Sequence, residues 1–361
     1  MLVGAGLQFL IPESVVPKAS IDGLLKILGT MGLILIVLEG GLDVHITKDK
    51  KGFILRSLLS SFVVLLASSF LLAFVLYMLV DASYYTCFVN AVPLSVISSA
   101  IAIPSAEALS PENKEFIVYE STFSDILGII LFTFVVKNDS IGIGAFTRLS
   151  GEIILVTLMS AAFSLLLFKL IEKITHKVKF FLILALLIIM YILGKEILHL
   201  PSLLMVFLFA LLMSNRDLFI VPKIKKFFDT RGFDLHLREF TLITSESAFI
   251  IRTFFFVVFG FFVPLATLTN GTVLLLGVLV FGVVLLVRYI YMVVVKAEPL
   301  NILTLIAPRG LITILLFLQL PDKHKLVDVN DGVLFIVIVL SLAALTVGTM
   351  ISGKKPPESI T

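Results

Sequence analysis

Residues 96–109 read VISSAIAIPSAEAL, and residues 303–315 read LTLIAPRGLITIL. Each stretch lies in the middle of a longer apolar run, yet each carries a proline and polar side chains at what would be membrane depth. Proline removes a backbone donor and clashes with the preceding turn of a helix, and glycine loosens the helix further. Both runs are therefore predicted to be interrupted helices. The residues expected in the unwound stretches are Pro104, Pro308 and Gly310.

The composition of the whole chain indicates a membrane protein. Of 361 residues, 59% are apolar and 15% are charged, and the mean hydropathy is +1.14. A soluble domain carries about 25% charged residues. The apolar residues also form runs of about twenty or more, long enough for an α-helix to cross the hydrocarbon layer. A spanning β-barrel would show short segments of alternating polarity instead. We expect an all-α polytopic membrane protein.

Apolar runs between polar breaks divide the chain into about twelve helical segments. We expect them near residues 2–11, 22–43, 53–80, 84–109, 115–137, 144–171, 179–198, 201–214, 239–265, 271–296, 299–320 and 331–352. The first segment is too short to cross a membrane alone. The polar connection 215–238 is expected at the membrane surface. Together the segments predict a single transmembrane domain over 1–361.

The two interrupted runs occupy corresponding places in two parts of the chain. If the segments alternate in direction, residues 22–137 and 239–352 form comparable four-helix units of opposite orientation, which is an inverted repeat. Paired interrupted helices in inverted halves are the best sequence pointer to a transporter's midplane site, whereas a single proline would indicate only a kink. Most loop Lys and Arg residues then fall on the side of both termini. This predicts cytoplasmic termini, with the plasma (inner) membrane as the expected location.

The densest set of polar side chains inside a predicted span lies in EFIVYESTFSDILGIILF, residues 115–132. Spacings of three and four residues place Ser121 near Ser124 and Asp125, and Glu120 near Ser124, so these four residues form one polar stripe on a helix. A carboxylate flanked by hydroxyls offers the hard oxygen ligands that a dehydrating alkali cation needs, and the same carboxylate oxygen can hold a proton instead. Ionisable groups at this depth are functional candidates by default.

Two arginines within predicted spans, Arg252 and Arg309, need anionic partners. Glu120 could neutralise either one, with Glu246 as a competitor, and this leaves Asp125 as the expected titrating group. Four other charged residues, counted near helix ends, are expected to reach the membrane surface with their charged groups: Lys26, Arg56, Glu152 and Arg288.

A second acidic segment is LILIVLEGGLDVH, residues 33–45. Its Asp43 is expected at the membrane boundary, where a solvated charge is ordinary. Glu39 lies one turn deeper in the membrane. It either lines the ion path or serves only the packing of the helices. Ser99 and Ser105 are also candidates for the ion path. Cys87 is the only cysteine, and no histidine pair has metal-ligand spacing. We therefore expect no cofactor, no metal beyond a transported alkali cation and no nucleic-acid partner.

Several segments together resemble the sodium/proton exchanger family, the NhaP and NHE-like monovalent cation:proton antiporters. The segments that carry the resemblance are LIVLEGGL (35–42), AIPSAEAL (102–109), YESTFSDILGIILF (119–132), LPSLLMVFLFALLMSN (200–215), SESAFIIRTFFFVVFGFFV (245–263) and APRGLITILL (307–316). The resemblance implies inverted repeats with two crossing unwound helices, exchange of Na⁺ or K⁺ for protons by alternating access, and a homodimer in the lipid bilayer.

By this resemblance, Asp125 takes the role of the ion- and proton-binding aspartate, and Glu120 that of the buried glutamate paired with an arginine. The sequence also departs from the family pattern. Ser124 replaces the asparagine beside the aspartate, and Ala102 and Ile103 replace a Thr-Asp pair before the proline. With one unpaired carboxylate left, electroneutral exchange is expected.

Other function classes remain open at this point. One alternative is an ion channel or uniporter on the same scaffold, which coupled proton and cation fluxes would exclude. Another is a degenerate, non-transporting relative. A membrane-embedded enzyme is disfavoured, because no nucleophile motif or histidine–carboxylate cluster lies in a predicted span.

Overall fold

The helices of this protein follow the predicted segments closely. A computed structural model describes residues 1–8, 18–46, 50–138, 142–173, 179–215 and 233–352. The helices are α1 (Leu2–Leu7), α2 (Lys18–Asp43), α3 (Lys51–Leu79), α4 (Tyr84–Ser95), α5 (Ser99–Ser105), α6 (Pro111–Lys137), α7 (Ile143–Lys173), α8 (Lys179–Ile192), α9 (Ser202–Ser214), α12 (Phe233–Phe262), α13 (Leu265–Leu268), α14 (Gly271–Val294), α15 (Leu300–Leu305), α16 (Leu311–Leu318) and α17 (Asp331–Ser352). Most of the predicted connection 215–238 lies outside the described residues, as does the end of the segment 2–11.

Seven helical stretches of the described residues are long and apolar enough to cross a membrane. They are Lys51–Leu79, Tyr84–Ala108, Pro111–Lys137, Ile143–Leu167, Leu237–Phe262, Gly271–Val294 and Asp331–Ser352. The protein is thus an all-α polytopic membrane protein, as predicted.

Helix α3 shows the reversed polarity that a lipid environment produces. Its outward side chains include Phe62, Phe70 and Phe74, each about half exposed. Its buried face carries small hydroxyl residues, Ser57, Ser60, Ser61, Ser68 and Ser69. In lipid, apolar side chains gain nothing by turning inward, and small residues let neighbouring helices approach closely.

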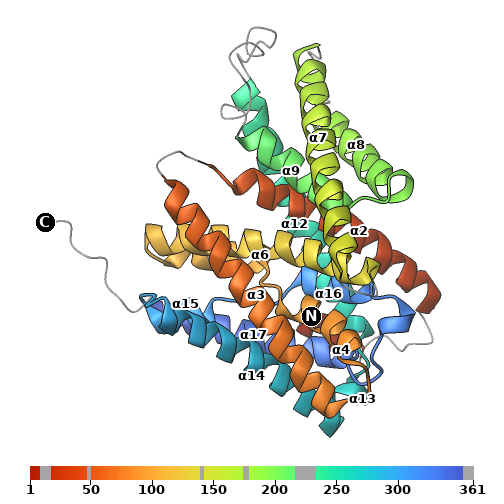
Figure 1. The fold of residues 1–361 in the computed structure, drawn as a ribbon, viewed down its shortest axis with the longest axis vertical. Helices are drawn as coiled ribbons and strands as arrows, with labels where there is room; N and C mark the ends of the chain where they lie inside the picture. Colours follow the sequence, from red (N-terminus) through yellow and green to blue (C-terminus); the bar gives the residue numbers. More distant parts are fainter. Residues whose placement is uncertain (9–17, 47–49, 139–141, 174–178, 216–232, 353–361) are drawn as a thin grey trace, which may run out of the picture. The chain divides into compact units, whose positions relative to one another are not determined.

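The chain forms two compact units, and the first contains both interrupted helices. It comprises residues 1–26, 49–132 and 255–361. Within it, α3 packs against α4 and α14, α14 packs against α17, and α15 lies against both α14 and α17 (Figure 1). α16 packs against α4. The repeat units predicted at 22–137 and 239–352 stay a prediction.

The second unit comprises residues 27–48 and 133–254, with α7, α8 and α9 packed together. Its α2 approaches α9 closely, because a Cβ on Gly41 would lie 2.6 Å from Ala210. Asn215, just after α9, donates to the Val44 carbonyl over 2.6 Å and accepts from the Ile46 N–H. These bonds fix the chain that leaves α2.

Both predicted interruptions are present. The first lies at residues 96–98, between α4 and α5, and the second at 306–310, between α15 and α16. Pro308 and Gly310 lie in the second break as predicted. Pro104 does not lie in the first, because it falls inside α5. The span that contains the first break is 83% buried, against 39% for α3, so the interrupted helix belongs to the interior of its unit.

Candidate functional site

The two interrupted helices meet at their unwound stretches. The Ser98 N–H in the first break donates to the Pro308 carbonyl in the second over 2.9 Å. Gly310 makes the close approach possible, since a Cβ at this position would lie 2.5 Å from the Ser98 hydroxyl oxygen. The crossing is therefore a direct backbone contact between the breaks.

Tertiary partners explain why the first break lies at residues 96–98 and not at Pro104. Three successive backbone N–H groups of this stretch bond outside their own helix. Ser98 donates to Pro308, Ile97 donates to the Ser124 hydroxyl over 3.0 Å, and Ser99 donates to the Asp125 carboxylate over 3.1 Å. Backbone groups buried in a membrane need internal partners, and α6 and the second break supply them here.

Asp125 lies on α6 and is buried against Ser99, the first residue of α5, with 5% of its surface exposed. Besides the Ser99 N–H, its carboxylate accepts a hydrogen bond from the Ser99 hydroxyl. The adjacent Ser98 hydroxyl is fully buried and has no hydrogen-bond partner among the described residues. The carboxylate and the Ser99 hydroxyl thus bring buried oxygen atoms together beside the crossing, of the kind that an alkali cation or a proton can occupy.

Two other serines predicted near the ion bond elsewhere. The buried Ser121 hydroxyl donates to the Ile117 carbonyl over 2.6 Å, and the half-buried Ser105 hydroxyl donates to Ile101 over 2.8 Å. Such bonds to the preceding turn satisfy a hydroxyl locally. The structure brings Ser99 and Ser124 to the Asp125 site, and the ion-binding roles of all these residues stay predictions.

Glu120 has a different partner from the two predicted. Its carboxylate forms a two-pronged ion pair with Arg288 of α14, over 3.0 and 2.8 Å, and also accepts from the Ser60 hydroxyl over 2.6 Å. Both members of the pair are 1% exposed. The expected pairing of Glu120 with Arg309 or Arg252 is wrong. So is the expectation that Arg288 reaches the membrane surface, because it lies more than a turn inside α14 and faces α6.

The buried arginines also bind the carboxyl ends of the half-helices. Arg288 donates to the Leu303 carbonyl of α15 over 2.9 Å, and Arg309 donates to the Leu94 carbonyl of α4 over 3.0 Å. The last carbonyls of a helix lack intrahelical partners and form the negative end of the helix dipole. Each guanidinium therefore donates to a carbonyl in the last turn of a half-helix, at the end where the helix dipole favours a positive charge.

Arg252 pairs with Glu39 in the second unit, over 2.8 Å. The side chains of this pair are 11% and 20% exposed, so it is only partly shielded. Glu39 is thus engaged with a guanidinium, and its role on an ion path stays a prediction.

Gly128 of α6 packs against the first break and yields a test of the packing. A Cβ at this position would lie 2.4 Å from a methyl group of Val96, a β-branched side chain with little rotational freedom. We expect Gly128→Ala to lower the free energy of unfolding by roughly 1–3 kcal/mol through overpacking.

Gly282 of α14 is the matched control, because a Cβ there meets nothing within 4 Å. Gly282→Ala should be neutral or raise stability by up to about 1 kcal/mol through helix propensity. Unfolding midpoints in detergent compare the two variants. Equal effects at both positions would contradict the close approach of α6 to the break.

The fold and this site define a class of protein. Two interrupted helices that cross at their unwound stretches, with a buried carboxylate at the crossing, characterise secondary transporters. A sequence profile of the family described as "Sodium/hydrogen exchanger, transmembrane" matches residues 1–353, so the chain belongs to this family of cation:proton antiporters. The resemblance drawn from the sequence is confirmed.

Solved structures support the same fold. The sodium proton antiporter MjNhaP1 from Methanocaldococcus jannaschii at pH 8 matches 98% of this chain and 90% of its own, with a TM-score of 0.73 and 17% identity. An electron-microscopy structure of MjNhaP1 matches 98% of this chain and 85% of its own, with a TM-score of 0.63 and 18% identity. A comparison with curated protein sequences gave no match.

Proposed function

We propose that this protein exchanges a monovalent cation, Na⁺ or K⁺, for a proton at Asp125 by alternating access. The observation that carries the proposal is the buried Asp125 carboxylate, which bonds to Ser99 where the first break meets α5. Na⁺ is the first candidate, because the structurally similar MjNhaP1 is described as a sodium proton antiporter.

Exchange follows if the carboxylate holds one occupant at a time. A dehydrated cation needs the negative charge of Asp125 and further oxygen ligands, for which Ser98, Ser99 and Ser124 are candidates. A proton removes that charge and with it most of the attraction for the cation. One cation then replaces one proton, and the exchange is electroneutral.

Alternating access requires the site to face each side of the membrane in turn. We propose that the helices over 84–137 and 299–352 move together relative to a dimerisation scaffold, because the two breaks are bonded to one another. Arg309 of the second break donates to the Leu94 carbonyl of α4, and the Ser98 N–H donates to the Pro308 carbonyl. Arg288 lies on α14, outside these two ranges, so its bonds to Leu303 and Glu120 would have to change during the movement. A homodimer and cytoplasmic termini in the plasma membrane belong to this proposal.

Flux measurements in proteoliposomes test the exchange. We expect an outward-directed gradient of Na⁺ or K⁺ to drive proton uptake, with one proton for each cation and no dependence on membrane potential. A panel of Na⁺, K⁺ and Li⁺ identifies the ion. Cation flux that follows the membrane potential without proton counter-movement would indicate a channel. The absence of any flux would indicate a non-transporting relative.

A further inference from the structure

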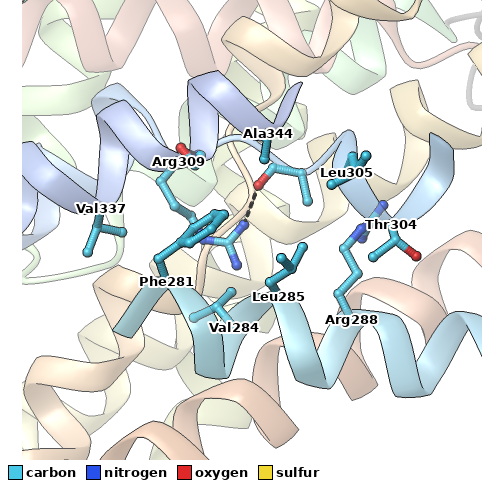
Figure 2. A pocket seen from close by; sticks show the side chains of 11 residues that line it. Phe281, Val284, Leu285, Arg288, Thr304, Leu305, Arg309, Val337 and Ala344 are labelled. Atoms are coloured by element: carbon cyan, nitrogen blue, oxygen red, sulfur yellow. Dashed lines mark hydrogen bonds between the residues drawn. The ribbon is translucent and has the colours of Figure 1, made fainter. Parts of the chain in front are cut away.

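A small cavity lies in the first unit beside the second break, apart from the Asp125 carboxylate. Its volume is about 20 Å³, which exceeds the roughly 10–15 Å³ that one water molecule needs. α14 lines one side with Phe281, Val284 and Leu285, and α17 contributes Ala344. Figure 2 shows the guanidinium of Arg309 pointing toward these α14 side chains.

Arg309 presents an unused donor in this cavity. The residue is 2% exposed and lines the cavity, and its Nη2 has no hydrogen-bond partner among the described residues. Its other nitrogens are engaged, since Nε donates to Leu94 and Nη1 donates to Ala307. A buried charged donor without a partner is costly, so an occupant that accepts from Nη2 would stabilise the protein.

The charges around the cavity do not balance. Arg288 also lines it, so two guanidiniums share this region, and the described residues that line it include no carboxylate. Glu120 is already bound through both carboxylate oxygens to Arg288. Arg309 makes no ion pair among the described residues, so carbonyl groups offset its charge in place of a carboxylate, in a wall that is otherwise largely apolar.

The two hydroxyls in the wall have no hydrogen left to donate to an occupant of the cavity. Thr304 donates to the Leu300 carbonyl and Ser341 donates to the Ile338 carbonyl, so both hydroxyl hydrogens are already used. The guanidinium nitrogens are the groups with hydrogens left to offer. An acceptor with a negative charge fits this arrangement better than a neutral water, because it also offsets the excess charge.

We propose that this cavity is a binding site for a small monatomic anion, with chloride as the physiological ligand. The anion would accept from Arg309 Nη2 and reduce the repulsion between the two guanidiniums. Because these guanidiniums bind the carboxyl ends of α4 and α15, an occupied site stabilises the helix crossing. The anion is a structural ligand in this account and is not transported.

Thermal unfolding of the purified full-length chain tests the site without a transport assay. Na⁺ concentration and ionic strength are held constant while chloride or bromide replaces gluconate, an anion too large for the cavity. A ligand that binds only the folded state raises Tm with its concentration. We expect a higher Tm in chloride and bromide than in gluconate. An equal Tm in all three anions would overturn the proposal.

Two neighbouring alanines on α17 provide a matched pair of variants. Ala344 lines the cavity, whereas Ala343 is exposed and does not. Ala344→Leu fills the space and should abolish the halide dependence of Tm, while Ala343→Leu should retain it. Halide dependence that survives in Ala344→Leu would place the effect elsewhere on the protein and overturn the assignment.

Crystallography locates the ion directly in the unmodified protein, whatever the variants do to folding. In crystals grown in bromide we expect an anomalous peak within hydrogen-bond distance of Arg309 Nη2. An empty cavity, or density without anomalous signal in bromide, would mean that the cavity is dry or holds water, and the proposal would be wrong. Neither outcome bears on cation exchange at Asp125, so the two proposals fail independently.

Discussion

Asp125→Asn should reduce cation-coupled proton flux to the level of protein-free liposomes. Asparagine keeps the shape of the side chain and an oxygen that can accept from the Ser99 N–H, so the contact with the first break survives. It cannot ionise, and it therefore loses both the charge that attracts a cation and the group that releases a proton. Proteoliposome flux with a pH-sensitive dye measures the result.

A second aspartate provides the control for this prediction. Asp322 lies between α16 and α17 with a side chain that is 95% exposed, and its nearest charged partner is Lys325. Asp322→Asn should leave the flux unchanged. If Asp125→Asn retained coupled exchange at the rate of the unmodified protein, Asp125 would not be the exchange site.

Removing Glu120 should produce the largest loss of stability. The carboxylate is 1% exposed and neutralises Arg288, so Glu120→Ala leaves a buried guanidinium without its counter-charge. Breaking such a pair from one side costs roughly 3–5 kcal/mol. Arg288→Met should cost a similar amount. The double variant Glu120→Ala with Arg288→Met should recover much of the loss, because no unpaired charge remains.

Equilibrium unfolding in mixed detergent micelles measures this coupling as a double-mutant cycle. The control is the pair formed by Lys50 and Glu115, which has a distance of 2.5 Å but exposed fractions of 47% and 29%. Exposed pairs contribute about 0–1 kcal/mol. If both cycles gave the same small coupling free energy, the burial of the Glu120–Arg288 pair would not increase its contribution to stability.

The sequence predicted the helices well because their boundaries depend on local composition. Apolar length alone located α3 and α14 to within a few residues. The break at 306–310 could also be predicted from the sequence, since Pro308 and Gly310 disrupt a helix locally. The first break was misplaced toward Pro104, because its position depends on Ser124 and Asp125, which lie more than 25 residues further along the chain.

The candidate site was predictable in part, where it depends on residues close together in the sequence. The spacing of polar residues on α6 singled out Asp125. The partner of Glu120 was not predictable, since three buried or partly buried arginines were available and only helix packing selects among them. One signal was present in the sequence. Arg288 lies in the apolar run 271–296, two turns before its end, which is deep for a residue expected at the surface.

Proton release on cation binding tests the central claim most directly. The purified protein in weakly buffered detergent solution receives NaCl or KCl, and the released protons are titrated against the bound cation. At a pH low enough for the empty site to hold a proton, we expect about one proton for each cation, an apparent affinity that weakens about tenfold for each further unit of pH lowered, and no release from Asp125→Asn. A cation that binds without releasing a proton, or equal release from Asp125→Asn, would contradict competition at this carboxylate.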